Sequence, residues 1–202
     1  DVSVSATHAV NMLDSLTLPQ TVEDAIGSVG ITLGSLAVAG GGSTGNVGIG
    51  ASVGINIFKT NTRASADRNS TVNGLSGAKA GSLSVTATDT LNWTSVAGSI
   101  GIATSGVGIG AGLDLNIIDK DTQAYIGLDA TVNVSGTVTL DANSSENLIS
   151  VAANAGVGDS VGIAGSASVA VIETTTKAYV ESAASLDDAA SVQAGGVTID
   201  AG

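Results

Sequence analysis

The stretch VGIGASVGINI, residues Val47–Ile57, decides how the chain folds. Its Val and Ile residues fall on one parity together with Ala51, whereas Gly, Ser and Asn fall on the other parity. Strict alternation with a period of two predicts a β-strand that has one buried face. We therefore expect the Val and Ile side chains to face a core. The small residues should mark a face that another layer approaches closely.

The three glycines of this stretch also suggest a dinucleotide-binding turn. Such a turn needs G-x-G-x-x-G between a strand and a helix, so that backbone N–H groups converge on phosphate. Gly48, Gly50 and Gly54 have one residue too many before the last glycine, and the residues that follow alternate like a strand. We expect no cofactor site here, and we assign the glycines to packing.

The same pattern recurs along the chain without a gap. The three copies read VGIGASVGINIFKTNTRA at 47–64, VGIGAGLDLNIIDKDTQA at 107–124 and VGIAGSASVAVIETTTKA at 161–178. A second block closes each unit, and its last residues are Ala6, Ala87, Ala142 and Ala201, which are 81, 55 and 59 residues apart. The chain therefore divides into three repeats at 1–87, 88–142 and 143–202. The first repeat carries an insertion at 8–34, in which we expect a short helix or an ordered loop.

One such unit cannot bury its apolar face alone, but stacked units bury a continuous core. The sequence therefore predicts an all-β fold, and more narrowly a β-solenoid of the β-helix type, with three repeats of about 55–60 residues. Strands of ten or eleven residues are long for one turn of such a stack. Antiparallel hairpins between each VGI block and the block before it therefore remain an alternative to parallel stacking.

Composition narrows the classes of function. Six basic residues against 18 acidic ones give a net charge of −12, which repels phosphate backbones and anionic lipid, so we expect no nucleic-acid partner. The chain has no cysteine, which excludes disulfides and thiolate metal sites. The sequence contains no uninterrupted apolar run long enough to cross a membrane, so we expect no membrane insertion. The sequence begins at Asp1 without a signal peptide, so we expect a processed product or a segment of a longer protein.

Few residues are candidates for metal binding or catalysis. Asp119 and Asp121 offer the hard oxygen ligands that Ca²⁺ prefers, although the other copies do not keep both acids. A polysaccharide-active enzyme would need carboxylates that converge in a cleft, and Asp114 would then join this pair. The single His8 has no cysteine or second histidine with which to build a metal site. We therefore expect a protein that is not an enzyme, with calcium as the one cofactor to consider.

Tyr125 and Tyr179 occupy the same position of the second and third copies, where the first copy has Ser65. This regularity predicts that the two rings form a structural stack rather than a platform for carbohydrate.

The run VGIGAGLDLNIIDKDTQAYIGLDATVNVSGTVTLDA, residues 107–142, resembles the repeats of very large secreted or surface adhesins of bacteria. These are the filamentous haemagglutinin-like proteins of two-partner secretion. The resemblance implies a right-handed β-helix, an extracellular or cell-surface location, and a role as a stalk or adhesive fibre. Such a stalk or fibre would act by rigid extension and by multivalent contact with surfaces.

The partners implied are neighbouring repeats or copies of the chain end to end, and the surfaces of host cells, matrix or other cells. A calcium-dependent extracellular binding module is the alternative function. A polysaccharide-active β-helix enzyme is the less favoured alternative.

Overall fold

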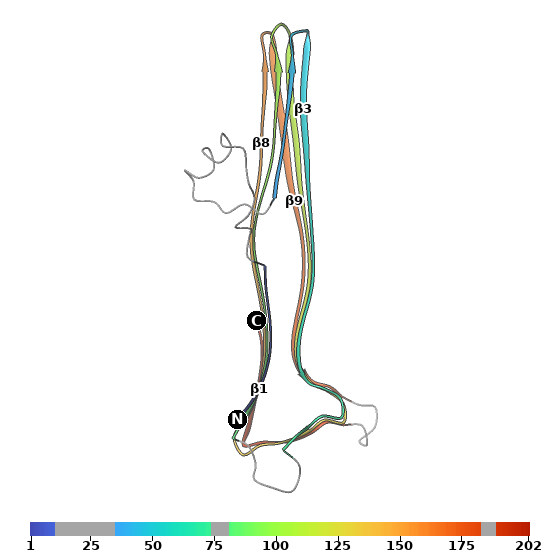
Figure 1. The fold of residues 1–202 in the computed structure, drawn as a ribbon, viewed down its shortest axis with the longest axis vertical. Helices are drawn as coiled ribbons and strands as arrows, with labels where there is room; N and C mark the ends of the chain where they lie inside the picture. Colours follow the sequence, from blue (N-terminus) through green and yellow to red (C-terminus); the bar gives the residue numbers. More distant parts are fainter. Residues whose placement is uncertain (11–34, 74–80, 183–188) are drawn as a thin grey trace.

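The structure, a computed structural model, describes residues 1–10, 35–73, 81–182 and 189–202 (Figure 1). All of the regular secondary structure in these residues is β-strand, which confirms the expected all-β class. The strands are β1 (Val2–Val10), β2 (Ser35–Ser43), β3 (Val47–Ala66), β4 (Thr71–Val72), β5 (Leu83–Ala103), β6 (Val107–Ile126), β7 (Thr131–Asn133), β8 (Thr137–Gly158), β9 (Val161–Val180), β10 (Ser191–Gln193) and β11 (Gly196–Ala201).

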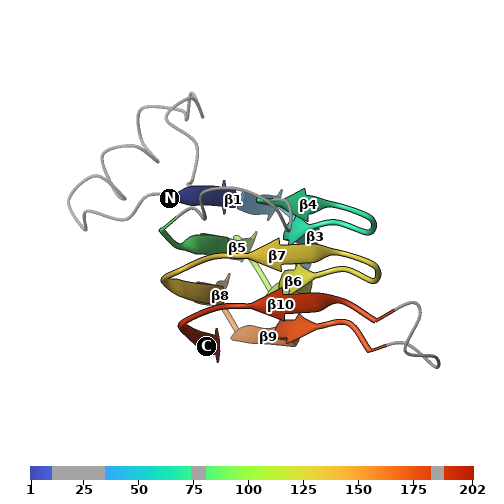
Figure 2. The same cartoon turned by 90° about the horizontal axis from the view of Figure 1, so that it is seen from below.

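The strands form three parallel sheets. Sheet A has the order β1-β5-β8-β11, with β2 also paired to β5; sheet B has the order β3-β6-β9; sheet C has the order β4-β7-β10. Sheets A and B are two long walls, joined by tight turns at one end and by the short strands of sheet C at the other (Figure 1). Seen from below, successive passes of the chain lie over one another (Figure 2). The antiparallel alternative is wrong within the described residues, because their strand pairings are parallel.

The ladders pair the residues that the sequence aligns. Val47 pairs with Val107, which pairs with Val161, and the whole length of β3, β6 and β9 follows in the same register. The closing alanines form one row in sheet A: Ala6, Ala87, Ala142 and Ala201. The long strands therefore stack residue upon residue, as a gapless alignment of the copies requires.

The segment expected as an insertion begins later than its sequence indicates. His8–Val10 continue strand β1, where Val10 pairs with Leu91. Strand β2 then begins at Ser35, which pairs with Ser95 on the same neighbouring strand. β1 and β2 thus lie along consecutive parts of β5, and the residues between them interrupt a single pass. The helix or loop expected there falls on residues 11–34, outside the described residues.

The hydrophobic core lies where the three sheets meet. Apolar side chains point inward there while Ser and Thr point outward, as an alternating strand with one buried face requires. The core residues are Ala64, Ala66, Leu83, Val85, Ala87, Ala124, Ile126, Ala130, Val132, Val134, Val138, Leu140 and Ala142.

The other half of the long walls has the opposite arrangement. We call residues 35–57, 95–117 and 149–171 the distal half. The inward parity of the strands does not change along their length. In the distal half, however, it carries Gly, Ser, Ala and Asn together with Asp114, whereas Val and Ile point outward. Ile57 is 68% exposed, whereas Gly48 and Gly50 are buried. The expectation that the Val and Ile face of Val47–Ile57 is buried is therefore wrong.

The close approach of sheets A and B explains this inversion. A Cβ atom on Gly48 would overlap the backbone carbonyl of Ile102, and one on Gly101 would overlap that of Ile109. The layer that approaches the small residues closely is therefore the facing wall of the same stack. Since the walls are in backbone contact, no room remains between them for Val or Ile, and these side chains lie outside.

Candidate functional site

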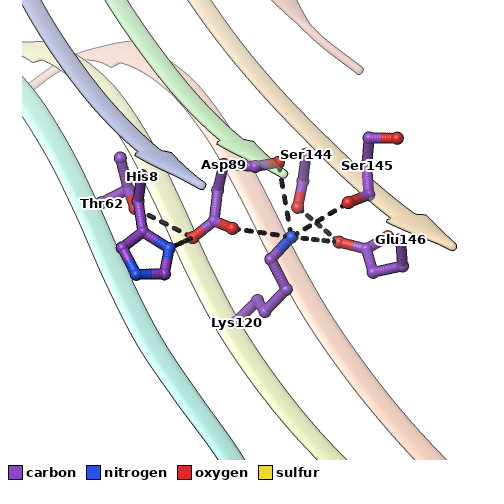
Figure 3. A network of polar contacts seen from close by, with 7 residues as sticks. All are labelled: His8, Thr62, Asp89, Lys120, Ser144, Ser145 and Glu146. Atoms are coloured by element: carbon purple, nitrogen blue, oxygen red, sulfur yellow. Dashed lines mark hydrogen bonds and ion pairs between the residues drawn. The ribbon is translucent and has the colours of Figure 1, made fainter. Parts of the chain in front are cut away.

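A network of charged and polar side chains joins β1, β3, β5, β6 and β8, with Lys120 and Asp89 buried at its centre (Figure 3). We call it the Lys120 network; its members are His8, Thr62, Asp89, Lys120 and Glu146. The Lys120 side chain is 0% exposed and that of Asp89 is 1% exposed. Lys120 Nζ lies 2.8 Å from Asp89 Oδ1 and 2.7 Å from Glu146 Oε1. One ammonium group therefore contacts two carboxylates in the interior of the stack.

Strand alternation brings these groups together. Asp89 occupies an inward position of β5, between the inward residues Ala87 and Leu91. Lys120 occupies an inward position of β6, next to the inward residue Ile118. β5 and β6 are the two long strands of one pass, so the carboxylate and the ammonium face each other from opposite walls. Glu146 joins them from β8, in the next pass.

Polar neighbours support the Asp89 carboxylate. Thr62 Oγ1 donates a hydrogen bond of 2.9 Å to Asp89 Oδ2, and His8 Nδ1 lies 3.5 Å from the same oxygen. Burial acts to raise the pKa of Asp89, but the hydrogen bonds from Lys120, Thr62 and Thr60 outweigh it and hold the pKa below its ordinary value. Asp89 is therefore a carboxylate at neutral pH.

The Lys120 network was not predicted from the sequence, although the sequence carries a signal for it. In LSVTATDTL, residues 83–91, one parity reads Leu, Val, Ala, Asp, Leu, so that a single acid interrupts an apolar face. Lys120 likewise shares its parity with Ile118 and Ala124. A charged residue on an otherwise apolar face predicts a buried partner of opposite charge. His8, which has no cysteine or second histidine with which to build a metal site, lies beside Asp89.

A second polar cluster lies between the walls of the distal half. Asn116 Nδ2 donates to Asp114 Oδ2 at 2.9 Å and to Ser95 Oγ at 3.0 Å. The hydroxyl groups of Ser95 and Ser150 also donate to Asp114 Oδ2, and Asn56 Nδ2 donates to Asn116 Oδ1 at 2.9 Å. These hydrogen bonds satisfy Asp114 Oδ2 and the Asn116 amide, which the close approach of the walls removes from water. The other carboxylate oxygen, Asp114 Oδ1, makes no hydrogen bond among the described residues.

The candidate calcium ligands lie on the outer face of β6. Asp119 Oδ2 is 2.7 Å from Lys59 Nζ, and Asp121 Oδ2 is 2.9 Å from Arg63 Nη2. Each carboxylate thus faces a cation of the neighbouring strand. The shallow hollow over this face, of about 340 Å³, is also lined by Lys177. In the part of the chain that the structure describes, no three His, Cys, Asp or Glu residues are placed to hold a metal ion together.

The three carboxylates considered for polysaccharide chemistry do not converge. Asp114 points inward and is fully buried, whereas Asp119 and Asp121 lie on the opposite face of the same strand. The cleft with two acids that such an enzyme requires is not formed by these residues.

The tyrosine pair forms the predicted stack. The ring centroids of Tyr125 and Tyr179 are 5.2 Å apart and the ring planes meet at 8°. The Tyr179 hydroxyl also donates a hydrogen bond to Gln123 Oε1 at 2.9 Å. The two rings are packed against each other along the direction in which the passes stack.

Both walls of the distal half expose large apolar side chains, which we call the outer apolar face. On sheet A they are Val38, Ile100, Ile102, Ile149, Val151 and Val157; on sheet B they are Val47, Ile49, Val53, Ile55, Ile57, Leu113, Val161, Ile163, Val169 and Val171. On sheet B, register pairing places these side chains in rows, such as Ile57 and Val171 with Ile117 between them, so they form a continuous surface. On sheet A, Ile102 and Val157 are register partners, whereas Val38 pairs with Gly98.

Comparison of the chain with protein-family models, with curated proteins and with solved structures found no match. No helix long and apolar enough to cross a membrane occurs in the described ranges.

Proposed function

We propose that the chain is a segment of a β-solenoid, a right-handed β-helix of three repeats, and that it serves as a structural stalk or adhesive segment of a large extracellular bacterial adhesin or fibre. Parallel stacking in register supports this proposal, because each added pass extends such a stack along one axis. The resemblance of residues 107–142 to adhesin repeats supports the cellular setting.

The main support for the proposal is the open end of the stack. Ile118 in β6 and Ile172 in β9 are register partners at the same inward position. Ile118 is 1% exposed because passes lie on both sides of it, whereas Ile172 is 50% exposed because β9 has a neighbour on one side only. An inward isoleucine left open in this way fits a further pass, which a second copy of the chain or adjoining repeats would supply.

The outer apolar face supports the adhesive part of the proposal. Soluble monomers rarely expose continuous apolar surfaces larger than a few hundred Å², and larger ones mark interaction sites. A rigid stack would repeat this face along its length, so that weak contacts add up through multivalency. The excess of acidic residues keeps the remaining surface soluble.

End-to-end stacking predicts that the isolated chain associates as its concentration rises. We expect the weight-average mass in sedimentation equilibrium to increase with protein concentration for the wild type. Ile172→Lys should remain a monomer, because the substitution places a charge in the open interior at the end of the stack. Val171→Lys is the matched control: it adds the same charge to the next residue of β9, on the outer face, and should associate as the wild type does.

A wild-type chain that stays monomeric at the highest attainable concentration would overturn end-to-end stacking. Loss of association in Val171→Lys with retention in Ile172→Lys would also reject it and would assign the contact to the outer apolar face.

A further inference from the structure

Lys120 and Asp89 are placed for a covalent reaction as well as for an ion pair. We propose that Lys120 Nζ and the Asp89 carboxyl carbon condense to an intramolecular amide, with Glu146 as the proton carrier, so that an isopeptide bond joins β5 to β6 across the interior.

The first support is the arrangement of nucleophile, electrophile and base. Nζ lies 2.8 Å from Asp89 Oδ1, so it also approaches the carboxyl carbon to which this oxygen is bonded. Holding two reacting groups in this way gives effective molarities of about 10⁵–10⁸ M in well-oriented intramolecular reactions. Glu146 Oε1 is 2.7 Å from the same nitrogen, within the range that proton transfer requires. Ser144 Oγ donates a hydrogen bond of 2.6 Å to Oε1 and fixes the position of the Glu146 carboxylate.

The steps balance without any co-reactant. The Lys120 ammonium passes one proton to Asp89 Oδ1, and the neutral amine attacks the carboxyl carbon to form the C–N bond. The negative charge of the tetrahedral intermediate lies on Oδ2, where the Thr62 hydroxyl donates its hydrogen bond. Glu146 accepts a second proton from the nitrogen and delivers it to the Oδ1 hydroxyl. The C–Oδ1 bond breaks, one water molecule leaves, and Glu146 is a carboxylate again.

The surroundings favour condensation over the ionic pair. Leu91 and Ile118, which are both buried, are inward residues adjacent to Asp89 and Lys120 on their own strands. The Lys120 side chain is 0% exposed and that of Asp89 is 1% exposed, so bulk water is excluded from both reacting groups. The reaction also converts two buried charges into one neutral amide, which removes their desolvation cost.

The chain contains an exposed pair with the same contact distance. Lys59 Nζ lies 2.7 Å from Asp119 Oδ2, but the Lys59 side chain is 80% exposed, and water stabilises both charges. This pair should remain ionic. It therefore serves as an internal control that separates the effect of burial from that of distance.

Intact mass measured after denaturation tests the proposal. The folded wild-type chain, incubated at neutral pH until its mass is constant, should be lighter than its sequence by one water molecule. Trypsin should fail to cut the denatured chain after Lys120 and should cut after Lys59. Asp-specific cleavage before Asp114 should leave the segments that contain Asp89 and Lys120 joined in one branched product.

Two variants test the roles of Lys120 as the nucleophile and Glu146 as the proton carrier. Lys120→Arg keeps the positive charge but removes the nucleophilic amine, because arginine stays protonated, so its mass should match the sequence. Glu146→Gln should show the full mass in freshly folded protein, because the proton carrier is absent. A folded wild type at full mass, cut by trypsin after Lys120, would overturn the proposal. Loss of water at the wild-type rate in Glu146→Gln would overturn the role of Glu146.

Discussion

Replacing the buried lysine should be the most damaging single substitution in the long walls. Compared with freshly folded wild type, in which the pair is still ionic, Lys120→Ala leaves the buried Asp89 carboxylate and the partly exposed Glu146 carboxylate without the ammonium that both contact. Removing one partner of a buried ion pair typically costs about 3–5 kcal/mol of unfolding free energy, because the remaining charge has lost its solvent and its partner. Urea denaturation followed by circular dichroism measures this loss.

Lys59→Ala is the control for Lys120→Ala. It removes an ammonium at the same contact distance from an aspartate, but on an exposed face, where water screens the pair. We expect its denaturation midpoint to stay close to that of the wild type. If the two variants lost stability to the same small extent, the buried network would not hold the two walls together.

The glycines between the walls should tolerate no side chain. On Gly41 of β2, a Cβ would overlap the backbone carbonyl of Ile49 on the facing wall, and backbone cannot rotate away as a side chain can. Gly41→Ala should therefore force the walls apart and lower the unfolding free energy by about 1–3 kcal/mol or more. Thermal denaturation monitored at a β-sheet wavelength records the loss.

The next residue provides the control for this substitution. Gly42 points outward on the same strand, and a Cβ there would meet nothing within 4 Å. Gly42→Ala should leave stability unchanged or raise it by about 0.4–1 kcal/mol, since alanine restricts the unfolded chain. Equal losses in the two variants would mean that the walls do not approach each other through the inward parity.

The repeat and its register were accessible from the sequence because they rest on identity between copies. The alignment of Val47, Val107 and Val161 needs no knowledge of packing, and in-register parallel stacking keeps the same residues side by side. The predicted Tyr125–Tyr179 stack has the same origin. Repetition thus predicts which residues are neighbours along the stack.

Which face of each strand points inward could not be predicted in the same way. Alternation defines two faces but does not say which one is inward, and the usual rule that apolar residues are buried chose the wrong face in Val47–Ile57. The deciding constraint is the close approach of the two walls, which places the backbone of one wall against the glycines of the other. The Lys120 network was missed for a related reason. Its members come from five strands, and Asp89 meets Lys120 only because β5 and β6 face each other.

Cysteine labelling within Val47–Ile57 tests the inverted orientation of the distal half most directly. The chain has no cysteine, so each variant carries one reactive group. Ser52 is 8% exposed and points inward, whereas Val53 is 59% exposed and points outward. In dilute folded protein, Val53→Cys should react with a maleimide at nearly the rate of the denatured chain, and Ser52→Cys should react only after unfolding. Fast labelling of Ser52→Cys together with protection of Val53→Cys would contradict the account.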